Sequence, residues 1–83
     1  MINQIKKFIL RALLAMAGTP MPEAALDQAV KDAVVPRPLQ SDIEQARREL
    51  EAGQFILGTR DDLDESVTWA LTTKGTLKAK QLG

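Results

Sequence analysis

The chain has 83 residues, of which 45% are hydrophobic and 27% charged, and its eleven basic side chains balance eleven acidic ones. A chain of this length forms one domain at most, so residues 1–83 are treated as a single domain. It contains no cysteine and no histidine, which excludes a disulfide framework, a thiolate metal site and the side chain most often used for acid–base catalysis near neutral pH. We therefore expect a globular protein that is not an enzyme and that binds no metal and no cofactor.

The N-terminal segment imitates a secretory signal, because Lys6 and Lys7 precede an apolar run that ends in Ala-Met-Ala. Two features argue against that interpretation: Arg11 interrupts the apolar run, and cleavage after Ala17 would remove the most hydrophobic helix of a small chain. No apolar run reaches the roughly 18–20 residues that a membrane span needs. We expect a cytoplasmic protein with no membrane partner.

Residues 3–17 have the pattern of a first helix, with Asn3 as its N-terminal cap. Its apolar face is wide and consists of Ile2, Ile5, Phe8, Ile9, Leu10, Ala12, Leu13, Leu14 and Met16. Such an arc fits a helix covered by the domain on both sides, or by the domain on one side and a second copy on the other. In the second case Leu10 and Leu14 form a homodimer contact. A membrane-surface helix explains less, because core packing already accounts for the apolar residues.

A second helix follows a break at residues 18–22, where one glycine and two prolines hold the chain extended. Pro22 fits the first turn of this helix. Its apolar stripe is Leu26, Ala29, Val30 and Ala33. The residues that we place toward water are Glu23, Asp27, Lys31 and Asp32. Residues 34–39 then form a rigid turn, because two prolines fix their own φ angles.

Residues 42–52 are predicted to form a third helix, with Ser41 and Glu44 as its capping box. The side chains that recur on one face and point to the core are Ile43, Ala46 and Leu50. On the outer side, two pairs of opposite charge stand four residues apart. They are Glu44 with Arg48 and Arg47 with Glu51.

Two runs rich in β-branched and aromatic residues, 54–60 and 66–72, predict a hairpin around the acidic turn at residues 61–65. By alternation, the residues placed in or against the core are Phe55, Leu57, Trp69 and Leu71, with Gln54 and Ile56 on the other face. The tail reads as a short last helix. The fold class is therefore α+β: a small winged helix of three helices, a two-stranded β-hairpin wing and a short C-terminal helix.

This order of elements resembles the winged helix-turn-helix transcriptional regulators of the MarR type over residues 3–77. In that family a leucine-rich helix, a glycine and an apolar pair lead into the wing, and an L-T-x-K-G sequence closes the last strand. The matching residues of the first part are Leu50, Gly53, Phe55 and Ile56, and those of the second part are Leu71, Thr72, Lys74 and Gly75. The resemblance implies a DNA-binding protein with its recognition helix at residues 41–52 and its wing tip at residues 59–66.

The resemblance also implies which side chains meet DNA. Those expected in the major groove are Gln40, Ser41, Gln45 and Arg48, and those expected on phosphate are Arg37 and Arg60. Gln and Arg are suitable types, since Gln pairs with adenine and Arg with guanine.

Charge favours a different partner. Residues 37–71 carry four arginines against eight carboxylates, whereas residues 1–20 and 72–83 carry three basic side chains each and no acid. DNA affinity rests largely on cations that displace counterions from phosphate. The alternative is therefore a winged-helix interaction module whose acidic wing and third helix dock on a basic surface of another protein. A metal site in the acidic turn is disfavoured, because the turn lacks the alternating acids and the glycine of a calcium loop.

Overall fold

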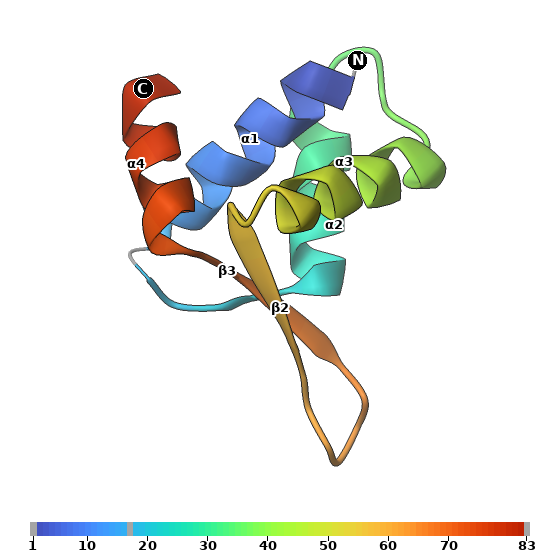
Figure 1. The fold of residues 1–83 in the computed structure, drawn as a ribbon. Helices are drawn as coiled ribbons and strands as arrows, with labels where there is room; N and C mark the ends of the chain where they lie inside the picture. The colour runs from blue at the N-terminus through green and yellow to red at the C-terminus, as the bar shows by residue number, and fades with distance from the viewer. Residues whose placement is uncertain (1, 17, 83) are drawn as a thin grey trace.

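The computed structural model describes residues 2–16 and 18–82, and within them it has four helices and three strands. In chain order they are α1 (Ile2–Ala15), β1 (Met21–Pro22), α2 (Glu23–Ala33), α3 (Gln40–Ala52), β2 (Ile56–Arg60), β3 (Val67–Leu71) and α4 (Thr73–Leu82). The strands form one antiparallel sheet in the order β1-β3-β2. The predicted α+β winged-helix fold is confirmed, with the wing formed by β2, β3 and their turn (Figure 1).

One strand was not predicted. Met21 pairs with Trp69 and Pro22 with Thr68, so the proline-rich break after α1 forms the third strand of the sheet. Pro22 also takes the N-cap position of α2, one residue before the position expected from sequence. The extended geometry that prolines impose on their neighbours suits both roles.

α1 is the central helix, and it contacts α2, α3 and α4. Ile5 and Ile9 are fully buried, and the helix starts at Ile2, so Asn3 lies inside it and does not cap it. The predicted end at Ala17 lies outside the described residues. No helix in residues 2–16 and 18–82 is long and apolar enough to cross a membrane.

The placement of Leu10 at a dimer surface needs correction. Leu10 is only 3% exposed and belongs to the core, and Leu14 is half-buried against it. The reason is that α4 folds back on α1, where Arg11 Nη2 donates a hydrogen bond of 3.2 Å to the carbonyl of Leu82. A homodimer through this part of α1 stays a prediction, with Leu14 as the more accessible of the two leucines.

The N-terminus of α3 lies two residues earlier than the predicted capping box. Leu39 is extended and is the N-cap, and its carbonyl accepts hydrogen bonds from the N–H groups of Asp42 and Ile43 at 3.0 and 3.2 Å. The Asp42 carboxylate accepts in return from the Leu39 N–H at 3.4 Å. Ser41 and Glu44 are therefore inside the helix, because the rigid prolines before Leu39 let it begin at Gln40.

The first strand of the wing has the opposite phase to the one predicted. Ile56 is 1% exposed and Leu57 is 59% exposed, so Ile56 faces the core and Leu57 faces solvent. The chain leaves α3 through Gln54, whose φ is +65°, and the strand begins only at Ile56. Alternation counted from Gln54 therefore assigns Ile56 and Leu57 to the wrong faces, whereas Phe55 and Leu71 pack against the core as predicted. The prediction for Trp69 is confirmed, since it is 6% exposed.

The junction between the wing and α4 explains the Leu-Thr-Thr-Lys-Gly segment. The Thr72 hydroxyl donates to the carbonyl of Gln54 at 2.5 Å, with the carbonyl of Phe55 also within reach at 3.1 Å. It accepts from the N–H of Gly75 at 3.0 Å, so it caps α4 and ties it to the segment between α3 and β2. Gly75 is buried, and a Cβ atom there would lie 1.8 Å from the Phe55 carbonyl oxygen. Only glycine allows this close approach of two backbones.

We expect Gly75→Ala to lower the free energy of unfolding by about 1–3 kcal/mol, the usual cost of forcing an extra methyl group into packed structure. The sign of this change in the free energy of unfolding is informative, because in an exposed helix the same substitution stabilises the protein by up to about 1 kcal/mol. Denaturant unfolding of the variant measures the change, and Lys80→Ala on the exposed side of α4 is the control. Equal or higher stability of Gly75→Ala would contradict the close backbone approach.

Candidate nucleic-acid interface

α3 buries one side and exposes the other. Ile43 and Ala46 are fully buried and Leu50 is 3% exposed, as predicted. At 100° per residue, the centre of the opposite side carries Ser41, Gln45 and Arg48, and all three are exposed. This set of three residues is called the outer face of α3. In winged helices that bind DNA, such a face enters the major groove.

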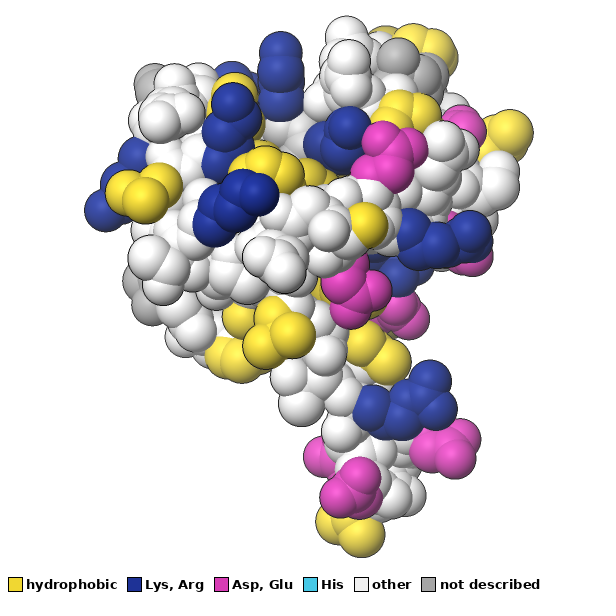
Figure 2. Space-filling model, viewed as in Figure 1, with side chains coloured by type: hydrophobic (Ala, Val, Ile, Leu, Met, Phe, Trp, Pro, Cys, Tyr) yellow, Lys and Arg dark blue, Asp and Glu magenta, His cyan; other side chains and the backbone are white. Residues whose placement is uncertain are grey.

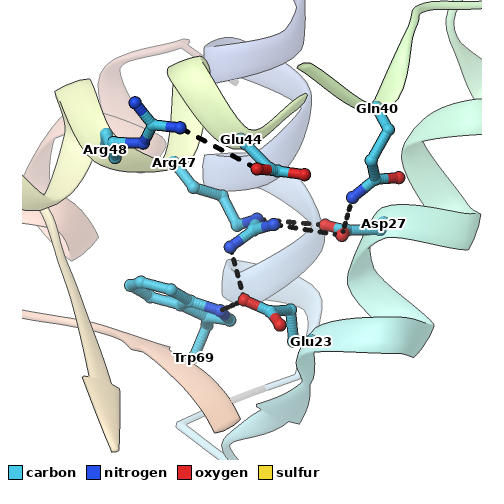
Figure 3. Close-up of polar contacts among 7 residues, drawn as sticks. All are labelled: Glu23, Asp27, Gln40, Glu44, Arg47, Arg48 and Trp69. Atoms are coloured by element: carbon cyan, nitrogen blue, oxygen red, sulfur yellow. Dashed lines mark hydrogen bonds and ion pairs between the residues drawn. The ribbon is translucent and has the colours of Figure 1, made fainter. Parts of the chain in front are cut away.

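The inner edge of α3 is fixed to α2 by a buried ion pair. Arg47 is 8% exposed and Asp27 is 7% exposed. The guanidinium binds the carboxylate through two parallel contacts, Nε to Oδ1 and Nη2 to Oδ2, each of 3.1 Å (Figure 3). This bidentate geometry fixes the rotation of α3 about its own axis, and with it the direction of the outer face.

The same guanidinium ties α3 to the sheet. Arg47 Nη1 binds Glu23 Oε1, which also accepts a hydrogen bond of 3.3 Å from Trp69 Nε1. The guanidinium carbon lies 5.6 Å from the centre of the Trp69 ring, a cation–π distance. Gln40 Nε2 donates to Asp27 Oδ2 at 2.8 Å (Figure 3). We call these five residues the Arg47 network.

Two sequence predictions fail at this network. Asp27 was placed toward water and is buried, and Arg47 was paired with Glu51 but binds α2 instead. A signal for both exists in the sequence, because each charge lies beside an apolar stripe of its helix. Asp27 follows Leu26, and Arg47 follows Ala46. Two opposite charges that border the facing sides of neighbouring helices are candidates for a buried pair.

The residues predicted to contact DNA are only partly brought together. Ser41, Gln45 and Arg48 share the outer face, whereas Gln40 is exposed but turns its amide to Asp27. Arg37 is exposed in the turn before α3, and Arg60 is exposed at the end of β2. The structure therefore offers one compact face on α3 and two separate arginines.

The polar side chains of the outer face have weak partners within α3. The side chain of Arg48 is 77% exposed, and its Nη2 lies 3.8 Å from Glu44 Oε1, which is one of the two predicted pairs. Gln45 Nε2 donates to Glu49 Oε2 at 3.0 Å. A pair this exposed contributes about 0.2–0.5 kcal/mol, so a ligand can displace it at low cost.

Acidic side chains are concentrated on the wing tip and are also present beside α3. The wing projects from the body (Figure 1), and Figure 2 shows acidic side chains gathered at its tip. The four acids of the tip are all exposed: Asp61, Asp62, Asp64 and Glu65. A hollow of about 390 Å³ beside α3 is lined by three carboxylates and two guanidinium groups. Among the described residues, no group of three or more acidic side chains is arranged to hold a metal ion.

Solved structures with this fold include ZitR of Lactococcus lactis, a winged-helix regulator of the MarR family. A cysteine-to-serine mutant of ZitR superposes with a TM-score of 0.73 at 23% identity, over 94% of this chain and 48% of that one. An apo form with a cysteine and a histidine replaced by alanine gives 0.74 at 22% identity, over 96% and 55%. This chain thus spans about half the length of ZitR. No protein-family model and no curated protein matches the sequence.

Arg47→Ala is expected to lower the free energy of unfolding by about 3–5 kcal/mol, because it leaves Asp27 buried without its charge partner. Arg48→Ala is the matched control on the same helix and should cost less than about 0.5 kcal/mol. Chemical denaturation of both variants measures the difference. Similar losses for the two arginines would contradict the buried network.

The ion pair between α1 and α3 generates a prediction about pH. The Lys6 ammonium lies 3.0 Å from Glu49 Oε1, and hydrogen bonds from Lys6 first and Gln45 second hold the pKa of Glu49 below its ordinary value. A carboxylate with a lowered pKa stabilises the fold above its unfolded-state pKa, and this stabilisation is lost as the pH falls through the lowered value. Lys6→Gln should raise the pKa of Glu49 in an NMR titration, whereas Lys31→Gln should leave it unchanged. An unchanged Glu49 pKa in Lys6→Gln would contradict the assigned cause.

Proposed function

We propose that this chain is a DNA-binding module of the winged-helix regulator type, which inserts the outer face of α3 into the major groove. The observation that carries the proposal is the combination of a helix locked on its inner side by the Arg47 network and a solvent-exposed set of polar side chains on its outer side. A rigid helix that presents hydrogen-bonding groups loses little conformational entropy when it binds.

Each residue of the outer face has a role in the proposal. Arg48 is long, charged and 77% exposed, and it is the candidate for a bidentate contact with guanine. Gln45 is the candidate for adenine, and Ser41 contacts a base edge or a phosphate near the start of the helix. Gln40 is removed from the set of base contacts, because its amide is held by Asp27.

Arg37 and Arg60 are proposed to contact phosphates on either side of the groove. Arg37 is exposed three residues before α3 begins, and Arg60 is exposed at the end of β2, where the wing tip starts. Because eight carboxylates accompany four arginines in residues 37–71, we expect the affinity for mixed-sequence DNA to be measurable mainly at low salt and to depend strongly on Arg48, the exposed cation of the outer face.

The fold shared with ZitR, a transcription regulator, supports a role in transcription regulation. The resemblance extends to about half of ZitR, so the proposal concerns the winged-helix module and not the remainder of a full regulator. A homodimer through α1 would place two such modules on one duplex, and Leu14 would take part in that contact.

The charge distribution favours a second candidate, a winged-helix protein-interaction module. In this alternative the acidic wing tip and the acidic side of α3 dock on a basic surface of another protein. The hollow beside α3, with Glu23, Glu44 and Glu51 in its lining, would attract cationic side chains rather than phosphates.

Titration of fluorescently labelled mixed-sequence duplex DNA with the protein, at low and at moderate salt, tests the first candidate by polarisation. Under the DNA-binding proposal the affinity falls with salt, and Arg48→Ala weakens binding by about 1–3 kcal/mol. Arg11→Ala, which removes an exposed arginine from α1, is the matched control and should bind as the wild type does.

Absence of binding at low salt, where electrostatic attraction is strongest, would overturn the DNA proposal and favour the interaction module. Equal losses for Arg48→Ala and Arg11→Ala would show that binding depends on overall charge and not on the outer face of α3.

A further inference from the structure

A groove with an apolar floor and a basic rim lies between α1, α3 and α4. Its volume is about 230 Å³. The floor is formed by Leu10, Leu50, Phe55 and Leu82, and the rim by Lys6, Lys7 and Lys78. Glu49 also lines the groove, but its carboxylate is paired with Lys6 at 3.0 Å, so the net charge of the rim stays positive. Figure 2 shows this surface as lysine and arginine side chains gathered around exposed hydrophobic ones, on the part of the molecule away from the wing tip. We call it the basic groove.

The size and the charge of the basic groove define what it can hold. It is smaller than the roughly 300–1,000 Å³ pockets that enclose drug-sized ligands, so it suits one apolar side chain rather than a small molecule. Lys7 and Lys78 are exposed on the rim, and Lys74 lies next to it, with its Nζ 4.5 Å from the centre of the Phe55 ring. The matching partner is an apolar side chain flanked by carboxylates.

The wing tip has this chemistry. Leu63 is 96% exposed and stands in the sequence Asp61-Asp62-Leu63-Asp64-Glu65. An apolar side chain this exposed at the end of a projecting hairpin contributes nothing to the core of its own chain. Figure 2 shows hydrophobic surface at the far end of the wing, next to acidic side chains.

The tip is also held in one shape. Asp61 Oδ1 accepts a hydrogen bond of 2.7 Å from the N–H of Leu63, and Asp64 Oδ1 accepts one of 2.9 Å from the N–H of Ser66. Hydrogen bonds from the side chain and the backbone of Ser66 hold the pKa of Asp64 below its ordinary value. A preformed loop loses little entropy on docking.

We propose that the wing tip of one copy docks in the basic groove of a second copy, with Leu63 on the Phe55 and Leu82 side chains and the flanking acids facing Lys7, Lys74 and Lys78. The wing points away from the body of its own chain (Figure 1), so the contact forms between copies. This contact joins two different surfaces and is therefore head-to-tail. One end of the assembly keeps a free wing tip and the other a free basic groove, so further copies can add. The contact is small, and association is weak and sensitive to salt.

Sedimentation velocity over a range of protein concentrations at low salt tests this inference with two neutralising variants. The groove variant is Lys7→Gln with Lys78→Gln, and the wing variant is Asp62→Asn with Leu63→Ser. All four positions are exposed, and circular dichroism verifies that both variants fold. Each variant alone should stay monomeric at concentrations where the wild type associates, and Lys31→Gln with Lys80→Gln, the charge-matched control, should associate as the wild type does.

A mixture of the two variants gives the sharpest result. The intact wing of the groove variant should dock in the intact groove of the wing variant, so an equimolar mixture should form a heterodimer that does not grow further. A monomeric wild type at low salt, or no heterodimer in the mixture, would overturn the proposal. Self-association that neither variant weakens would overturn it too and would point to the α1 contact. Arg48→Ala should associate normally, which separates this test from that of DNA binding.

Discussion

The bidentate pair of Arg47 and Asp27 is the interaction on which the rest of the molecule depends. Removing two charges from water is costly, and the cost is offset only when every polar atom finds a partner in good geometry. Here Gln40 and Glu23 complete the set, and Trp69 covers the guanidinium. Ile43, Ala46 and Leu50 set which side of α3 is buried, and the two parallel bonds of the guanidinium to the carboxylate narrow the range of rotations further. The pair thus joins α2, α3 and the sheet in a single relative orientation.

The helices and the wing could be predicted because they depend on local chemistry. Hydrophobic periodicity and the breaks at glycine and proline identify α1, α2, α3 and the hairpin within a few residues. Which side chains of β2 face the core could not be predicted in this way. The strand begins after Gln54, whose positive φ sets the facing of the residues that follow, and the composition of the strand does not show it. The burial of Asp27 was missed for a related reason: periodicity shows which face of a helix is apolar but not which charge on a neighbouring helix will meet its edge.

In the candidate site, too, the features set by local sequence patterns could be predicted, and those set by the placement of neighbouring helices could not. The outward direction of Ser41, Gln45 and Arg48 follows from the spacing of the core residues of α3. The engagement of Gln40 with Asp27 could not be foreseen, because it requires knowledge of how two helices are placed. Charge segregation along the chain is visible in the sequence. The tertiary structure alone shows that the two basic terminal segments meet beside one apolar groove, and that the four acids of the wing tip stand apart from it.

Trp69 is the only tryptophan of a chain that has no tyrosine, and its indole N–H is bonded to the carboxylate that binds Arg47. Intrinsic fluorescence excited at the indole band therefore arises from one ring, which sits where α2, α3 and the sheet meet. Because a nearby cation and a hydrogen-bonded N–H both affect indole emission, a variant that breaks the contact between α3 and the sheet is expected to change the spectrum of the folded protein. Trp69, a member of the Arg47 network, is thus also an intrinsic fluorescent probe of that network. No label has to be attached to follow how α3 is held.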